Sequence, residues 1–144
     1  MILVDANLLL YAHFPRYAQH TRARDWLQSQ LDDTEAVGLA WQSLMAFVRI
    51  ATNPRAFPNP EPIGSVWRQV ELWLSSDAAW IPQPMDSHSR LLGEMLVSGN
   101  AYGDLVPDAH LAALAIEHGL TLCSNDRDFA RFPKLRWINP LAGQ

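Results

Sequence analysis

Four aspartates could form a site for chemistry, because each stands beside a segment that would bring it to one edge of a sheet. Asp5 and Asp126 each follow a short apolar run, Asp108 opens an alanine-rich helical pattern, and Asp128 lies two residues beyond Asp126. In open α/β sheets, functional groups gather outside the carboxyl ends of the strands. Clustered carboxylates repel one another unless a cation lies among them, and hard oxygen ligands suit Mg²⁺ or Mn²⁺. We therefore expect Asp5, Asp108 and Asp126 to bind one of these ions.

Each aspartate also has a structural explanation when taken alone, since an Asp at a helix start accepts hydrogen bonds from free N–H groups. Taken together, they favour a metal site that activates a water and braces a phosphoryl group. Phospho-acceptor receiver domains and aspartate-nucleophile phosphatases also carry acids at strand ends, but they need a lysine in the site. Lys134 is the only lysine of this chain, and it does not follow a predicted strand.

The motifs of several other enzyme classes are absent from the sequence. It contains neither a glycine-rich phosphate-binding loop nor the Gly-x-Ser-x-Gly motif of Ser-His-Asp hydrolases. A metal-free ribonuclease would need paired histidines as acid and base. The sequence shows no such pairing among its five histidines, which are His13, His20, His88, His110 and His118.

The composition is that of a globular domain. Apolar residues make up 49% of the 144 residues and charged residues 18%, so we expect one domain over 1–144 with a short tail at 139–144. No apolar run reaches membrane-spanning length, and the start lacks the basic region of a signal peptide, which favours a cytoplasmic protein. The single cysteine, Cys123, excludes an intrachain disulfide and a cysteine-based metal site.

The net charge of −4 bears on the kind of partner that the protein can bind. A protein that grips nucleic acid through a general basic surface is usually strongly basic. If this chain acts on nucleic acid, we expect local arginine contacts to phosphates and a bound metal to offset the repulsion. The candidate arginines near the acidic motifs are Arg49, Arg55, Arg127 and Arg131.

Hydrophobic periodicity, proline and glycine predict alternating strands and helices. Strands are expected at residues 1–4, 36–39, 79–81, 120–123 and 136–138. Helices are expected at residues 7–14, 20–31, 41–52, 64–75, 87–97 and 107–118, with a loop over 99–106. This alternation indicates an α/β fold with a mostly parallel sheet flanked by helices.

Three motifs carry a resemblance to a known family. They are Ile2-Leu3-Val4-Asp5-Ala6-Asn7, Val106-Pro107-Asp108-Ala109-His110-Leu111-Ala112-Ala113-Leu114-Ala115 and Ser124-Asn125-Asp126-Arg127-Asp128-Phe129. At these motifs the chain resembles the PIN-domain family and, within it, the VapC toxins of bacterial type II toxin–antitoxin pairs. The resemblance implies a PIN-like three-layer α/β/α fold and a Mg²⁺- or Mn²⁺-dependent endoribonuclease that cuts structured RNA such as tRNA or rRNA. It also implies a homodimer silenced by a cognate antitoxin.

The same resemblance assigns roles to individual residues. It makes Asp5, Asp108 and Asp126 the metal ligands and Asp128 an accessory acid. Asn7 and Ser124 match polar positions beside the metal.

One departure from the family concerns the third helix, where a glutamate usually precedes an arginine in a Glu-x-x-Arg pattern. Alignment on Arg49 places Ala46 at the glutamate position. Losing this acid should weaken metal binding, although Gln42 or Asp104 could partly replace it. The alternative function is therefore a catalytically weakened PIN domain that binds RNA or an antitoxin.

Two further alternatives stay open. An α/β hydrolase of small molecules with an acidic metal site would cleave phosphate esters rather than RNA. Among the six tryptophans, Trp67 and Trp73 could form a dimer or antitoxin surface, or they could pack in the core.

Overall fold

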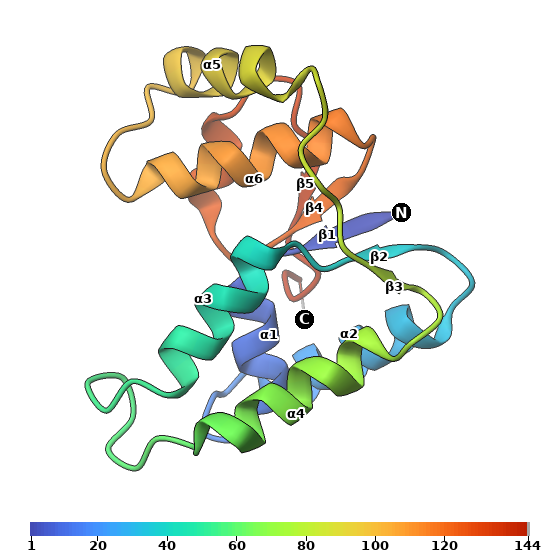
Figure 1. The fold of residues 1–144 in the computed structure, drawn as a ribbon, viewed down its shortest axis with the longest axis vertical. Coiled ribbons are helices and arrows are strands. Elements are labelled where there is room, and N and C mark those ends of the chain that lie inside the picture. The colour runs from blue at the N-terminus through green and yellow to red at the C-terminus, as the bar shows by residue number, and fades with distance from the viewer. Residues whose placement is uncertain (144) are drawn as a thin grey trace.

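The computed structural model describes residues 1–143 and contains one central sheet (Figure 1). The strands run in the order β3-β2-β1-β4-β5, and every neighbouring pair is parallel. The prediction of a mostly parallel sheet is confirmed, and in the described residues the sheet is parallel throughout. The strands are β1 (Ile2–Val4), β2 (Val37–Gly38), β3 (Ala79–Trp80), β4 (Thr121–Cys123) and β5 (Trp137–Ile138).

Helices cover both faces of the sheet, as Figure 1 shows, with α5 and α6 on one side and α1 to α4 on the other. The helices are α1 (Ala6–His13), α2 (His20–Asp32), α3 (Trp41–Ala51), α4 (Ile63–Leu74), α5 (His88–Ser98) and α6 (Leu105–Glu117). Successive strand residues point to opposite faces. Val4 and Cys123 accordingly pack in the core under α1 to α4, whereas Leu3 and Leu122 pack against α5 and α6. The expected three-layer α/β/α architecture is confirmed.

The strand order places a topological switch point between β1 and β4. From β1 the chain proceeds to β2 and β3 on one side of the sheet, and it later returns to β4 and β5 on the other side. A crevice forms outside the carboxyl ends of two strands where the order reverses in this way. Asp5 follows β1 and Ser124 follows β4, so both residues lie at the mouth of this crevice.

The start of α6 differs from its prediction. The helix begins at Leu105, two residues before Pro107, so the expected loop over 99–106 ends too late. Pro107 is tolerated as the third helical residue because the first four N–H groups of a helix have no partner within it. Every other predicted helix or strand boundary lies within one residue of the structure. A short 3₁₀ helix, η1 (Arg127–Arg131), replaces part of the polar turn expected there.

Within the short tail predicted over 139–144, residues 139–141 are partly or fully buried, and residues 142 and 143 are exposed. Leu141 is buried in the core under α1 to α4, and Arg22 donates a hydrogen bond to its carbonyl oxygen. The Asn139 Oδ1 accepts a bond of 3.0 Å from the Leu141 N–H. Residue 144 lies outside the described residues. No helix within 1–143 is long and apolar enough to cross a membrane.

Candidate metal centre

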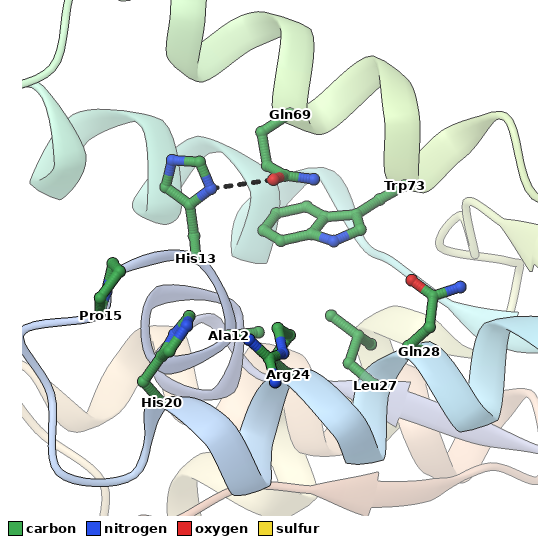
Figure 2. Close-up of a pocket in the computed structure, with 9 residues that line it drawn as sticks. All are labelled: Ala12, His13, Pro15, His20, Arg24, Leu27, Gln28, Gln69 and Trp73. Atoms are coloured by element: carbon green, nitrogen blue, oxygen red, sulfur yellow. Dashed lines mark hydrogen bonds between the residues drawn. The ribbon is translucent and has the colours of Figure 1, made fainter.

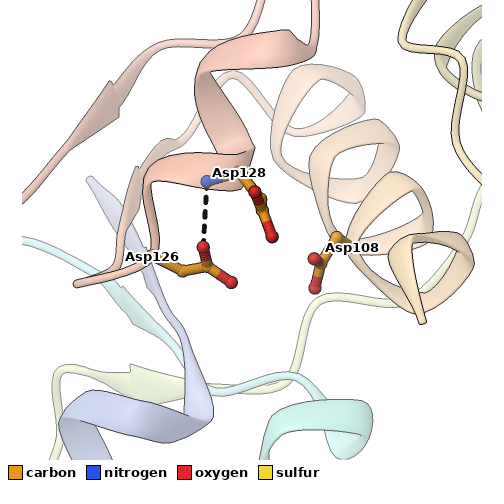
Figure 3. Close-up of side chains that lie close together, drawn as sticks. All are labelled: Asp108, Asp126 and Asp128. Carbon is orange, nitrogen blue, oxygen red and sulfur yellow. Dashed lines mark hydrogen bonds between the residues drawn. The ribbon is translucent and has the colours of Figure 1, made fainter.

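Three carboxylates converge at the switch point of the sheet. Figure 3 shows Asp108 on α6 facing Asp126 and Asp128, which come from the segment after β4. One oxygen of each side chain lies within 4.8 Å of the others. Asp108 reaches this edge because a helix that precedes a parallel strand runs antiparallel to it, so the first turn of α6 lies near the carboxyl end of β4. The predicted convergence of segments far apart in the sequence is therefore observed for Asp108 and Asp126.

Asp5 joins this cluster through a buried serine. The Ser124 hydroxyl donates a hydrogen bond of 2.7 Å to the Asp5 Oδ2. It accepts bonds from the Asn7 side-chain amide (3.1 Å) and from the Asp126 N–H (3.0 Å). A hydroxyl has one proton and two lone pairs, so these three bonds satisfy it completely and fix its proton toward Asp5. Asn7 and Ser124 thus hold β1 and β4 together at the site.

Two of the acids also have the structural role that their positions suggest. Asp5 is the N-cap of α1, and its Oδ1 accepts a bond of 2.8 Å from the Ala6 N–H. Asp126 caps η1 by accepting a bond of 2.9 Å from the Asp128 N–H. Both carboxylates are therefore held in fixed orientations by their own backbone neighbours.

The electrostatics of the cluster favour a bound cation. Burial, together with repulsion from Asp5, Asp126 and Asp128, raises the pKa of Asp108 to about 7, and Arg131 partly opposes the shift. Burial also raises the pKa of Asp5, against the hydrogen bonds from Ser124 and Ala6. A divalent ion would remove this repulsion, and carboxylate oxygens are the donors that Mg²⁺ and Mn²⁺ prefer. The donor set therefore fits the predicted ion.

A pocket of about 420 Å³ adjoins the acids. Asp5 and Asp108 line it together with Ala46 and Arg49 from α3. Ala46 therefore lies beside the carboxylates, at the place from which the family's glutamate would face them. Arg49 gives this pocket a cation that could contact a phosphate.

The two residues considered as replacements for the glutamate have different positions. Gln42 lines the same pocket, but its side-chain amide donates a bond of 2.8 Å to the Pro107 carbonyl oxygen and so ties α3 to α6. Asp104 is the exposed N-cap residue of α6 and does not line this pocket.

Unlike Arg49, the other three candidate arginines do not line the pocket beside the acids. Arg55 follows the end of α3 and does not line the pocket; its backbone N–H bonds the Asn53 Oδ1. Arg127 is exposed and is the first residue of η1, between two acids of the cluster. Arg131 donates to the Gly99 carbonyl oxygen at 3.1 Å, so it anchors η1 to the end of α5.

The expectation of unpaired histidines is wrong for one pair. The packing of α5 on α6 brings the His88 Nε2 to 2.9 Å from the His110 Nδ1, although the two residues are far apart in sequence. The His88 Nδ1 contacts Glu117 at 3.0 Å, and that carboxylate is completely buried. Both nitrogens of His88 are thus engaged, so the pair does not offer the separate acid and base of a metal-free ribonuclease.

Sequence reasoning missed two polar residues behind the acids. The Asn125 N–H donates to the Asn7 Oδ1 at 3.3 Å, and its side-chain amide donates to the Tyr11 hydroxyl at 3.3 Å. The position of Asn125 between Ser124 and Asp126 was the available signal. These bonds extend the polar network from β4 to α1.

A second pocket, of about 380 Å³, lies between α1, α2 and α4 (Figure 2). His13 and Trp73 line it, and the His13 Nδ1 lies 2.9 Å from the Gln69 Oε1. No carboxylate lines this pocket, so it does not compete as a metal site. Trp73 packs in the core, which was one of the two alternatives considered for it. Trp67 on α4 is 39% exposed.

The family model of the PIN domain matches residues 2–135. The chain belongs to the PIN-domain family. This PIN domain is 42% identical to Ribonuclease VapC37 of Mycobacterium tuberculosis (strain ATCC 25618 / H37Rv) over 142 residues, which cover 99% of both chains. It is 40% identical to Ribonuclease VapC31 of the same strain, over 97% of this chain and 99% of that one. These full-length similarities identify it as a PIN domain of the VapC type.

Solved structures confirm the fold. The PIN domain matches VapBC-1 from nontypeable Haemophilus influenzae with a TM-score of 0.69 at 18% identity, over 97% of this chain and 98% of that one. It matches FitAcB from Neisseria gonorrhoeae with a TM-score of 0.68 at 20% identity, over the same shares of the two chains.

Proposed function

We propose that this PIN domain is an endoribonuclease toxin of the VapC type, which hydrolyses RNA with Mg²⁺ or Mn²⁺. The observation that carries the proposal is the convergence of Asp108, Asp126 and Asp128 within 4.8 Å at the switch point, next to the partly buried Asp5. The relatives named ribonucleases support the reaction class.

The residues divide into metal ligands, orienting groups and a phosphate contact. Asp5, Asp108 and Asp126 would hold the ion, with Asp128 as an accessory acid. A divalent ion bound there would lower the pKa of an attacking water and neutralise charge on the phosphate. Ser124 and Asn7 keep the Asp5 carboxylate in one orientation, and Arg49 would contact a phosphate oxygen. Water adds across the phosphodiester, leaving a 5′-phosphate and a 3′-hydroxyl, and no protein group is modified.

The partners follow from the VapC type. We propose that a cognate antitoxin protein silences the enzyme, and that tRNA or rRNA is the substrate. The structural neighbours, solved as VapBC-1 and FitAcB, support a paired protein. We also propose a homodimer in solution, which light scattering would test.

The decisive experiment compares two aspartate variants on labelled tRNA and rRNA with Mn²⁺. Asp126→Asn should lower the cleavage rate at least about 100-fold, because one metal ligand is lost while the side chain keeps its size. The exposed Asp77→Asn is the matched control and should cleave at the wild-type rate. EDTA should abolish cleavage by the wild type. Wild-type turnover in Asp126→Asn, or cleavage in EDTA, would contradict the proposal.

The second candidate function is a weakened PIN domain that binds RNA or an antitoxin without cutting. Ala46 in the acid-lined pocket is the observation that favours it, since an acid is missing there. RNA binding without any metal-dependent cleavage would establish this alternative.

A further inference from the structure

Two tryptophans on α3 and α4 expose their rings to water. Trp41 on α3 and Trp67 on α4 have ring planes that differ by 6° and ring centroids 6.4 Å apart. Their side chains are 40% and 39% exposed. Neither belongs to either of the two core clusters found in residues 1–143. Core packing therefore does not explain this pair.

One face of α3 connects Trp41 with the acid-lined pocket. Trp41, Met45 and Arg49 recur every four residues, so they lie in a row with about one helical turn, or ~6 Å, between neighbours. Met45 is 60% exposed, and both Met45 and Arg49 line the pocket that contains Asp5 and Asp108. The row thus carries flat aromatic faces at one end and a cation at the other, with the acids alongside.

An unpaired RNA nucleotide matches this combination of groups. Sites for single-stranded nucleic acid combine aromatic side chains, on which bases stack, with cations that follow the phosphates. Here Arg49 provides the cation, and one turn of helix separates each group from the next, which is close to the spacing of successive nucleotides. The acids beside the row would meet the phosphate between a stacked base and its neighbour.

We propose that Trp41 is a stacking platform for an unpaired base beside the scissile phosphate, and that Trp67 holds the Trp41 ring in place. This inference rests on the proposed ribonuclease function and adds a substrate-positioning residue to it. Bases in a duplex already stack on each other and are not available to the platform.

The test measures stacking separately from cleavage. A single-stranded oligoribonucleotide carrying 2-aminopurine is titrated with Mg²⁺ present into the slow variant Asp126→Asn, alone and combined with each second substitution. Stacking on an indole quenches 2-aminopurine, so Asp126→Asn alone should quench the probe. Adding Trp41→Ala should abolish the quenching and raise the Kd about tenfold, whereas Trp41→Phe should retain most of the affinity. Val97→Ala, which alters a side chain 82% exposed on α5, should have no effect.

Kinetics of the otherwise wild-type enzyme complete the test. Trp41→Ala should raise KM for a hairpin RNA about tenfold and change kcat little, because the metal ligands are intact. Trp41→Phe serves as the folded counterpart if the alanine variant melts early. Unchanged Kd and KM in Trp41→Ala would overturn the inference and leave the ribonuclease function standing. A variant that binds RNA normally but loses dimerisation or antitoxin binding would also overturn it, since the rings would then serve a protein interface. If wild type neither cuts RNA nor binds the probe, both proposals fail.

Discussion

Ala46 presents a methyl group to the pocket that Asp5 and Asp108 line. A carboxylate at this position would add a negative oxygen donor next to the cluster. Since the number of charged ligands sets the affinity of a site for hard cations, the present site should need more divalent metal than one with a fourth acid.

Ala46→Glu tests this idea directly. The Mg²⁺ concentration for half-maximal cleavage should fall about threefold or more, because the new carboxylate raises the charge of the ligand set. Ala46→Gln provides the control, since it adds the same volume without charge and should not lower the requirement. A metal requirement that stays the same or rises in Ala46→Glu would contradict the prediction.

The raised pKa of Asp108 makes the stability of the metal-free protein depend on pH. Its pKa of about 7 in the fold lies above the ordinary value of 3.8, so between these two pH values the folded chain holds more protons than the unfolded chain. The contribution of Asp108 to stability is then present at low pH and is lost as pH rises through 7.

Asp108→Asn removes this titration, because the amide stays neutral at every pH. In EDTA at pH 8 its melting temperature should exceed that of wild type by about 3 °C, and the difference should shrink at pH 5. Asp77→Asn should show no such pH dependence. Equal effects of Asp108→Asn at both pH values would show that titration of the partly buried Asp108 carboxyl is not the cause.

The positions of the aspartates at strand ends and helix starts could be predicted, because the spacing of these residues along the chain is a local property. Asp5 and Asp126 follow strands of three residues, and the pattern of apolar residues marks where those strands end. The pairing of His88 with His110 could not be predicted in this way, because it depends on how α5 packs on α6. Stacking of Trp41 on Trp67 likewise requires the tertiary arrangement of α3 and α4.

At the scale of elements, the end of α5 positions the segment that carries two of the acids. Gly99 is the C-cap of α5, and a Cβ added there would lie 2.7 Å from the Met95 carbonyl oxygen and 2.8 Å from the Phe132 ring. Phe132 directly follows η1. The close approach of α5 to this segment therefore requires a residue without a side chain.

Gly99→Ala should destabilise the protein by about 1–3 kcal/mol, because the backbone oxygen and the buried ring cannot both move away. Gly93 in the same helix is the matched control, since a Cβ there meets nothing within 4 Å. Gly93→Ala should stabilise by about 0.5–1 kcal/mol through helix propensity. Urea unfolding of both variants checks the prediction, and loss of stability in both would point to a general effect of alanine in α5.

The helices and strands themselves follow from local sequence, with one instructive exception. The start of α6 at Leu105 could not be predicted from Pro107, because proline is compatible with any position in the first turn. A proline therefore indicates that a helix begins nearby, but it does not specify the first residue of that helix.

At the scale of the whole molecule, the metal centre joins segments from both ends of the chain. Asp5 directly follows β1 near the start of the chain, whereas Asp126 and Asp128 follow β4. The unfolded chain would not keep these side chains together. Metal binding should therefore stabilise the whole fold, in addition to its role in catalysis.

Thermal unfolding in Mn²⁺ measures this linkage. At a concentration of about 100 times Kd, the free energy of unfolding should rise by about 2.7 kcal/mol, which corresponds to an increase in melting temperature of about 8 °C. Asp126→Asn should lose most of the increase and Asp77→Asn should keep it. An equal rise in wild type and Asp126→Asn would place the ion elsewhere.

The fold class could be predicted from the alternation of strands and helices together with the resemblance to the PIN-domain family. The parallel order β3-β2-β1-β4-β5 was not predicted, because strand lengths and periodicity do not specify which strands are neighbours. The packing of Leu141 under α1 to α4 was also missed, since a single apolar residue near an end gives no periodic signal.

The strands of this sheet are only two or three residues long, so very few backbone amides are protected by it. The Asp5 amide bonds the Cys123 carbonyl oxygen at 3.0 Å, and the Leu122 amide bonds that of Arg136 at 2.8 Å. In deuterated water, these central protons should be among the last to be replaced, long after those at the helix ends. Slow isotope exchange would thus be confined to a narrow band that passes directly beneath the acids.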